Sequence, residues 1–160
     1  MEETGQQVAS AERYQRGLTL KKAGYYKSAF MQFELASSDP AYALRAFAHM
    51  GLCLRAVGRS EEAVTAFRKA LALTGSSKKD TVQLLYVIGR TLESLGQVSE
   101  ALEAYRWIRR EDAGYRDVAN RIGQLSARRP MTIDKRSLFR SPSGSDTTLK
   151  FRPTRLPSTK

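Results

Sequence analysis

The fold of this chain is decided by residues 41–74, which run AYALRAFAHMGLCLRAVGRSEEAVTAFRKALALT. In the first half, apolar residues recur at steps of three and four, the spacing of one helix face, at Phe47, Met50, Gly51 and Leu54. After Gly58 a second stripe of the same period contains Ala63, Ala66, Phe67, Ala70 and Leu71. Two amphipathic helices joined by a short turn form an antiparallel hairpin. One hairpin cannot bury both stripes, so it needs neighbours of the same kind.

The same pattern recurs on both sides of this stretch. Its five landmarks are two glycines, an alanine, an aromatic residue and a last apolar residue, at Gly51, Gly58, Ala63, Phe67 and Ala70. They recur 34 residues earlier at Gly17, Gly24, Ala29, Phe33 and Ala36, and 38 residues later at Gly89, Gly96, Ala101, Tyr105 and Ile108. This register predicts six helices, near Val8–Lys22, Tyr26–Ser37, Ala41–Val57, Ser60–Leu73, Thr81–Leu95 and Val98–Arg110.

This order of glycine, alanine and aromatic landmarks resembles the tetratricopeptide repeat family. The resemblance covers residues 9–112 in three copies, although Phe47 stands where the family often has tryptophan. It implies an all-α solenoid of helical hairpins. The mid-helix glycine of each copy is tolerable if the partner helix passes too close to admit a methyl group, and the second glycine supplies the turn.

The residues after the third repeat predict a capping helix and then a disordered tail. One more apolar stripe, which would cover the open face of the last repeat, contains Tyr115, Val118, Ile122 and Leu125. From Arg128 onward lie four of the five prolines and ten Ser or Thr, a composition that cannot bury enough apolar surface to fold. We therefore expect a disordered N-terminus, a three-repeat domain with its capping helix, and a disordered basic tail, at residues 1–7, 8–127 and 128–160.

The net charge of the 160-residue chain is +11, and it is unevenly placed. Residues 128–160 hold nine Lys or Arg against two Asp or Glu, so the repeat domain is only mildly basic. Such a balance allows nucleic acid, an anionic membrane or an acidic protein as partner. The polar N-terminus predicts no signal peptide, and no apolar run is long enough to span a membrane, so we expect a cytoplasmic protein.

Side chains that could carry catalysis are sparse. The single histidine, His49, lies four residues before the single cysteine, Cys53, and two ligands are fewer than a metal site needs. One cysteine also excludes a disulfide within the chain. There is no phosphate-binding loop of the Gly-x-x-x-x-Gly-Lys type. We therefore predict no enzymatic activity, no metal and no cofactor.

The resemblance implies that the first helix of each repeat lines a concave surface that holds a partner peptide. By register this groove contains Tyr14, Leu18, Lys21, Lys22, Arg45, His49, Leu52, Arg55, Gln83, Tyr86 and Arg90. Five basic side chains and two tyrosines predict a segment with Asp or Glu and an apolar anchor, although an ordinary solvated helix face is the alternative interpretation. Some family members clamp a terminal carboxylate with two lysines, two asparagines and an arginine. That clamp is absent here, because the matching places hold Tyr14, Leu18, His49, Gln83 and Val87.

These features predict a non-enzymatic adaptor or scaffold that binds an acidic or mixed peptide segment of another protein. One alternative is a small tetratricopeptide secretion chaperone that cradles an extended peptide, but those proteins are usually acidic and lack a long basic tail. A second is a factor that uses the basic tail to associate with nucleic acid or another anionic surface. Charge alone supports this second alternative, so nucleic acid is the weaker partner class. Self-association also stays open, because repeat domains of this kind often form homo-oligomers.

Overall fold

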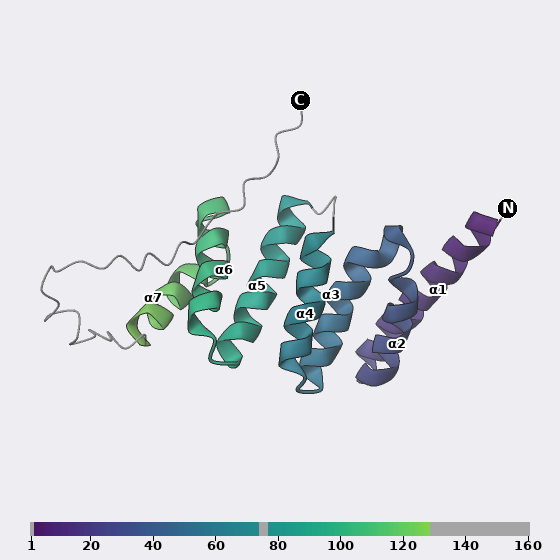
Figure 1. Cartoon of the computed structure of the whole chain (residues 1–160), viewed down its shortest axis with the longest axis horizontal. Coiled ribbons are helices and arrows are strands. Elements are labelled where there is room, and N and C mark those ends of the chain that lie inside the picture. Colours follow the sequence, from purple (N-terminus) through teal and green to yellow (C-terminus); the bar gives the residue numbers. More distant parts are fainter. Residues whose placement is uncertain (1, 74–76, 129–160) are drawn as a thin grey trace, which may run out of the picture. The chain divides into compact units, whose positions relative to one another are not determined.

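The computed structural model describes residues 2–73 and 77–128, and the described residues form seven helices and no strand. The helices are α1 (Glu2–Lys22), α2 (Tyr26–Ala36), α3 (Pro40–Ala56), α4 (Ser60–Ala72), α5 (Lys78–Ser94), α6 (Val98–Glu111) and α7 (Val118–Arg128) (Figure 1). They confirm the predicted fold class, an all-α solenoid of three helical hairpins followed by a capping helix.

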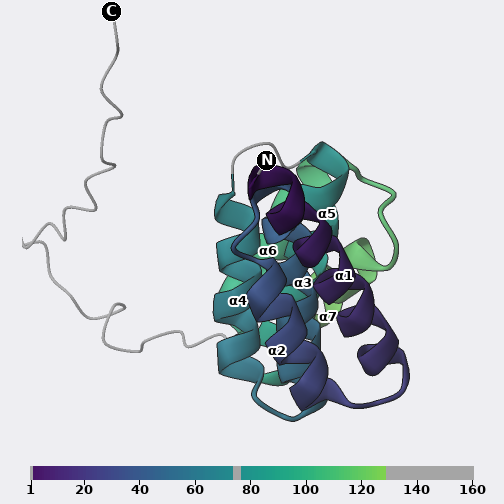
Figure 2. The ribbon, with the colours of Figure 1, turned by 90° about the vertical axis from the view of Figure 1, so that its right-hand side faces the viewer.

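Each helix packs against its neighbours in chain order. α1 pairs with α2, α3 with α4 and α5 with α6, and each hairpin also contacts the next one. The first helices of the hairpins lie in one layer and the second helices in the other (Figure 2). One layer of the repeats therefore consists of α1, α3 and α5, the helices that are predicted to line the binding surface for a partner.

Each hairpin turns at a glycine with a left-handed backbone. At Gly58 φ is 84°, and its N–H donates to the Arg55 carbonyl at 3.1 Å. The next N–H, of Arg59, donates to the Leu54 carbonyl at 2.9 Å, so two carbonyls at the end of α3 gain partners. A left-handed φ is strained for residues with a Cβ, which is why the turn needs glycine. The same geometry recurs at Gly24 and Gly96.

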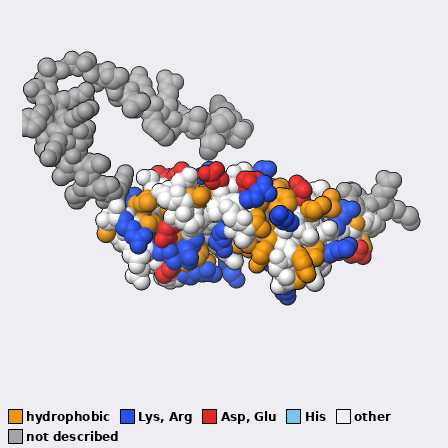
Figure 3. All heavy atoms as spheres, turned by 90° about the horizontal axis from the view of Figure 1, so that it is seen from below, with side chains coloured by type: hydrophobic (Ala, Val, Ile, Leu, Met, Phe, Trp, Pro, Cys, Tyr) orange, Lys and Arg blue, Asp and Glu red, His pale blue; other side chains and the backbone are white. Residues whose placement is uncertain are grey.

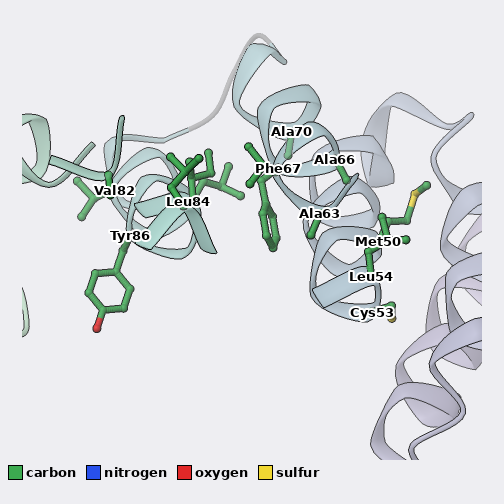
Figure 4. Packing of buried hydrophobic residues seen from close by; sticks show 14 of the residues in the cluster. Met50, Cys53, Leu54, Ala63, Ala66, Phe67, Ala70, Val82, Leu84 and Tyr86 are labelled. Atoms are coloured by element: carbon green, nitrogen blue, oxygen red, sulfur yellow. The ribbon is translucent and has the colours of Figure 1, made fainter. Parts of the chain in front are cut away.

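The glycine in the middle of α3 makes room for an aromatic ring of α4. A Cβ added at Gly51 would lie 2.5 Å from Cε1 of Phe67, whose side chain is 1% exposed. Figure 4 shows this ring beside the small residues Ala63, Ala66 and Ala70 of α4. The same contact recurs at Gly17–Phe33 and Gly89–Tyr105. The close partner of each glycine is therefore an aromatic ring of the second helix.

Two helices begin at least three residues earlier than the periodicity predicts. Residues 2–7 belong to α1, where a disordered N-terminus was expected; they contain no proline that would stop the helix. α5 begins at Lys78 instead of Thr81, because Ser77 caps it. The Ser77 Oγ accepts the Asp80 N–H at 3.1 Å and donates to Asp80 Oδ2 at 2.7 Å.

The last helix, α7, covers the third hairpin as the apolar stripe predicts. Its Val118, Ile122 and Leu125 are buried in the same core as Tyr105 and Ile108 of α6. Each such side chain contributes about 1.5–3 kcal/mol when it is removed from water.

The start of α7 differs from the predicted stripe by three residues. The stripe begins at Tyr115, whereas the helix begins at Val118. Between them Arg116 has φ of 46°, a conformation that a right-handed helix cannot contain. The unit of packed helices ends with α7, and the predicted tail beyond Arg128 lies outside the described residues.

We expect Gly51→Ala to lower the free energy of unfolding by about 1–3 kcal/mol, because the new methyl group would meet the buried Phe67 ring. Gly123→Ala is the matched control: it lies in α7 with no atom within 4 Å of its added Cβ, and should stabilise the helix by up to about 1 kcal/mol. Chemical denaturation of the full chain measures both effects. Equal unfolding midpoints for the two variants would contradict the packing account.

We expect a chain that stops after Arg128 to keep the melting temperature and helical circular dichroism of the full chain, because it retains all seven helices of the described residues. A chain that stops after Ala113 should melt at a clearly lower temperature or aggregate, since the core residues Tyr105 and Ile108 lose their cover. If the shorter chain were as stable as the longer one, α7 would not be a capping helix.

Candidate binding surface on α3 and α5

Two adjacent hollows open where side chains of α3 and α5 face each other. The first has a volume of about 250 Å³ and is lined by Tyr14, Leu44, Arg45, Ala48, His49, Leu52, Phe67, Asp80, Gln83, Leu84 and Val87. The second has a volume of about 420 Å³ and is lined by Arg55, Tyr86, Val87, Arg90, Ser94 and Arg116. Because Val87 lines both, the hollows follow one another along α3 and α5.

Most of the predicted site residues line these hollows. The first hollow contains Tyr14, Arg45, His49, Leu52 and Gln83, and the second contains Arg55, Tyr86 and Arg90. Lys21 is connected to the first hollow through a contact with His49. Leu18 is half-buried against the core and Lys22 is exposed at the end of α1, and neither lines the two hollows.

The two tyrosines of the predicted groove are almost fully buried. Tyr14 is 7% exposed, and its ring packs against Phe33 and Tyr42 with centroid separations of 5.7 and 5.3 Å. Tyr86 is also 7% exposed, and its side chain points away from Phe67 (Figure 4). Its hydroxyl donates to Asp117 Oδ1 at 2.8 Å. Both rings fill space between helices, so each exposes little surface to a partner.

His49 is held neutral by its surroundings. Its ring stacks on Phe33 with centroids 5.0 Å apart, and Lys21 Nζ lies 3.0 Å from Nδ1. Burial first, and then the positive charge of Lys21, lower the pKa of His49 to about 4. The ammonium of Lys21 must therefore donate to an unprotonated Nδ1, which ties the end of α1 to α3.

The first hollow combines an apolar floor with charge of both signs. Leucines and an alanine supply the floor, at Leu44, Ala48, Leu52 and Leu84. Arg45 and Asp80 lie at the same hollow, and Asp80 was not among the predicted site residues. This lining suits an apolar side chain with polar groups on either side of it.

The second hollow is basic. Arg55 comes from α3, Arg90 from α5 and Arg116 from the turn before α7. The periodic pattern missed Arg116 because this residue lies between helices. Its guanidinium lies over the Tyr86 ring at 4.8 Å and the Tyr115 ring at 5.3 Å.

Seen from the end at which the hairpins turn, Lys and Arg side chains are spread over the surface with apolar side chains between them (Figure 3).

Other chemistry finds little support in the part of the chain that the structure describes. Residues 2–73 and 77–128 contain no group of three or more His, Cys, Asp or Glu that could hold a metal ion. Cys53 is buried, and burial raises the pKa of its thiol, which disfavours the reactive thiolate. No helix in these ranges is both long and apolar enough to cross a membrane.

A family model described as tetratricopeptide repeat matches residues 42–110, which include most of α3 and α4 and extend through α5 into α6. No curated protein matches the sequence.

Several solved structures share the fold at low sequence identity. The Yersinia enterocolitica type III secretion chaperone SycD, crystallised with a peptide of the translocator YopD, is 15% identical, with a TM-score of 0.63 over 73% of this chain and 92% of that chain. The tetratricopeptide domain of Arabidopsis OM64 is 16% identical, with a TM-score of 0.62 over 76% and 98%. PcrH from Pseudomonas aeruginosa is 17% identical, with a TM-score of 0.57 over 74% and 86%.

The family match and the repeat geometry agree with each other. The match covers the second and third hairpins, and the first hairpin repeats their glycine turn and their glycine–ring contact. This chain therefore contains tetratricopeptide repeats over residues 42–110, and its first hairpin has the same geometry.

Proposed function

We propose that this protein is a non-enzymatic adaptor or scaffold that binds an extended segment of another protein along α3 and α5. The observation that carries this proposal is the arrangement of two different hollows in series on one face, joined at Val87. A continuous segment that lies across both would meet an apolar floor and then a basic lining. Two such subsites in a fixed order select a sequence better than either one alone.

The linings indicate an acidic or mixed segment with one apolar anchor. In the first hollow, the floor around Leu52 accepts an apolar side chain, while Arg45 and Asp80 accept polar neighbours of either sign. In the second hollow, Arg55 and Arg90 attract Asp or Glu side chains, which would speed the encounter as well as strengthen the complex. The same charges disfavour a basic segment.

A secretion chaperone is the second candidate, and one observation favours it. This chain has the fold of SycD over 92% of SycD's length, and SycD was crystallised with a peptide of the protein YopD. We propose that, in this case too, the peptide would lie along α3 and α5. The two candidates share this surface and differ in the partner, which would be a secreted protein for a chaperone.

We expect the double substitution Arg55→Glu and Arg90→Glu to abolish capture of a partner by the full chain, because it reverses the charge of the second hollow. The matched control is Arg106→Glu with Arg109→Glu, which makes the same change of charge on exposed residues of α6. Pull-down followed by mass spectrometry measures capture, and circular dichroism checks the fold. Equal loss of capture in both pairs would reduce the effect to net charge and contradict a local basic site.

We expect Gln83→Trp to weaken capture at least about tenfold, because an indole ring would fill the first hollow from an exposed position on α5. Gln124→Trp places the same ring at an exposed position of α7, outside both hollows, and should leave capture unchanged. Tyr86→Ala is not a clean test, since its loss would also release Asp117. Unchanged capture by Gln83→Trp would show that the partner binds elsewhere, and the proposed function would fail.

A further inference from the structure

We propose that the second hollow is an anion subsite that takes a doubly charged oxyanion group of the bound segment, either a phosphoserine or two adjacent carboxylates. This inference rests on the proposed function and names the group that the basic end of the surface recognises. Three arginines carry it: Arg55, Arg90 and Arg116, which line one hollow of about 420 Å³.

The lining of this hollow contains no carboxylate. Besides the three arginines it consists of Tyr86, Val87 and Ser94. In the part of the chain that the structure describes, none of the three arginines forms a salt bridge with Asp or Glu. Three guanidinium groups therefore share a small space without a counter-charge, and an anion of matching size would relieve their repulsion.

The carboxylates nearest in the chain to these arginines are already engaged elsewhere. Asp117, next to Arg116, accepts the Tyr86 hydroxyl and lies 2.8 Å from Arg121 Nε. Glu93, on the same helix as Arg90, accepts from Arg121 Nη1 at 2.8 Å and from the Tyr105 hydroxyl at 3.0 Å. Both carboxylates are therefore directed at Arg121, and neither forms an ion pair with the three arginines of the hollow.

Arg116 is held in place before any ligand arrives. Its backbone has φ of 46°, and its guanidinium lies over the rings of Tyr86 and Tyr115. Stacking uses the faces of the guanidinium and leaves the N–H groups at its edge free to donate to oxygen atoms. Tyr86 is itself fixed by Asp117, so the position of Arg116 depends on side chains of the packed core.

The charges of the other two arginines also favour an anion. Burial, and then the neighbouring positive charge of Arg90, lower the pKa of Arg55. A bound anion would stabilise both charges. A phosphoryl group offers about two negative charges and three acceptor oxygens, and therefore matches several guanidinium groups better than one carboxylate does.

Inorganic phosphate tests the subsite without knowledge of the partner. In the isotope-labelled full chain, phosphate should shift the arginine side-chain NMR signals with saturation, and acetate should do so much more weakly. Arg116→Gln should weaken phosphate binding at least about tenfold, the effect of losing a charge-assisted hydrogen bond. The control Arg106→Gln removes the same charge from an exposed position of α6 outside the hollow and should bind as wild type does.

A second variant and a comparison of three peptides complete the test. If Arg116→Gln fails to keep the helical circular dichroism, Arg90→Gln on the exposed side of α5 serves as the second variant and should weaken binding similarly. Alanine pentapeptides with a central phosphoserine, a Glu-Glu pair or a serine then separate the two sources. Tighter binding of the phosphoserine peptide would identify a phosphoryl group as the ligand, and tighter binding of the Glu-Glu peptide would identify two adjacent carboxylates. The subsite would be overturned if the serine peptide bound as tightly as the two charged peptides, or if Arg106→Gln weakened phosphate binding as much as Arg116→Gln does. The proposed function would still be decided separately, by the Gln83→Trp result.

Discussion

The contact between a glycine of the first helix and an aromatic ring of the second helix is the constraint on which the rest of the structure depends. At Gly51 the ring of Phe67 occupies the space that a Cβ would need, and the same geometry recurs at the other two hairpins. The contact brings the two helices of a hairpin close together and buries the largest apolar group between them. With the hairpin angle set in this way, successive hairpins stack with their first helices in one layer.

That layer leads directly to the candidate binding surface. Because α3 and α5 are neighbours in it, side chains that are distant in sequence, such as Arg55 and Arg90, line one hollow. The capping helix has a second role here. Arg121 of α7 engages both Glu93 and Asp117, and Asp117 in turn fixes Tyr86 under the guanidinium of Arg116. The helix that covers the core thus also supplies the ion-pair partner of both carboxylates.

Much of the fold could be predicted from the sequence because its signals are local. Gly58 marks a turn, because the left-handed φ of that turn strongly favours glycine. The apolar stripe of Val118, Ile122 and Leu125 marks a helix that packs on the apolar face of its neighbour. The start of α5 was missed although its signal was present: Ser77 followed three residues later by Asp80 is the pattern of a capping box.

The site was less predictable, because periodicity locates a helix face but not what covers it. The first helices of a solenoid are contacted both by their own partner and by the next hairpin. Tyr14 is therefore covered by Phe33 of α2 and Tyr42 of α3, and Tyr86 by Tyr115. Arg116 could not be found at all, since its place depends on a left-handed backbone between two helices.

A partner segment should lie along α3 and α5 and not across the opposite layer of α4 and α6. Hydrogen exchange of the full chain, measured free and bound to the partner that it captures, tests this most directly. We expect binding to slow exchange in α3, in α5 and around Arg116, and to leave α4 and α6 nearly unchanged. Protection confined to α4 and α6, with none in α3 or α5, would contradict it.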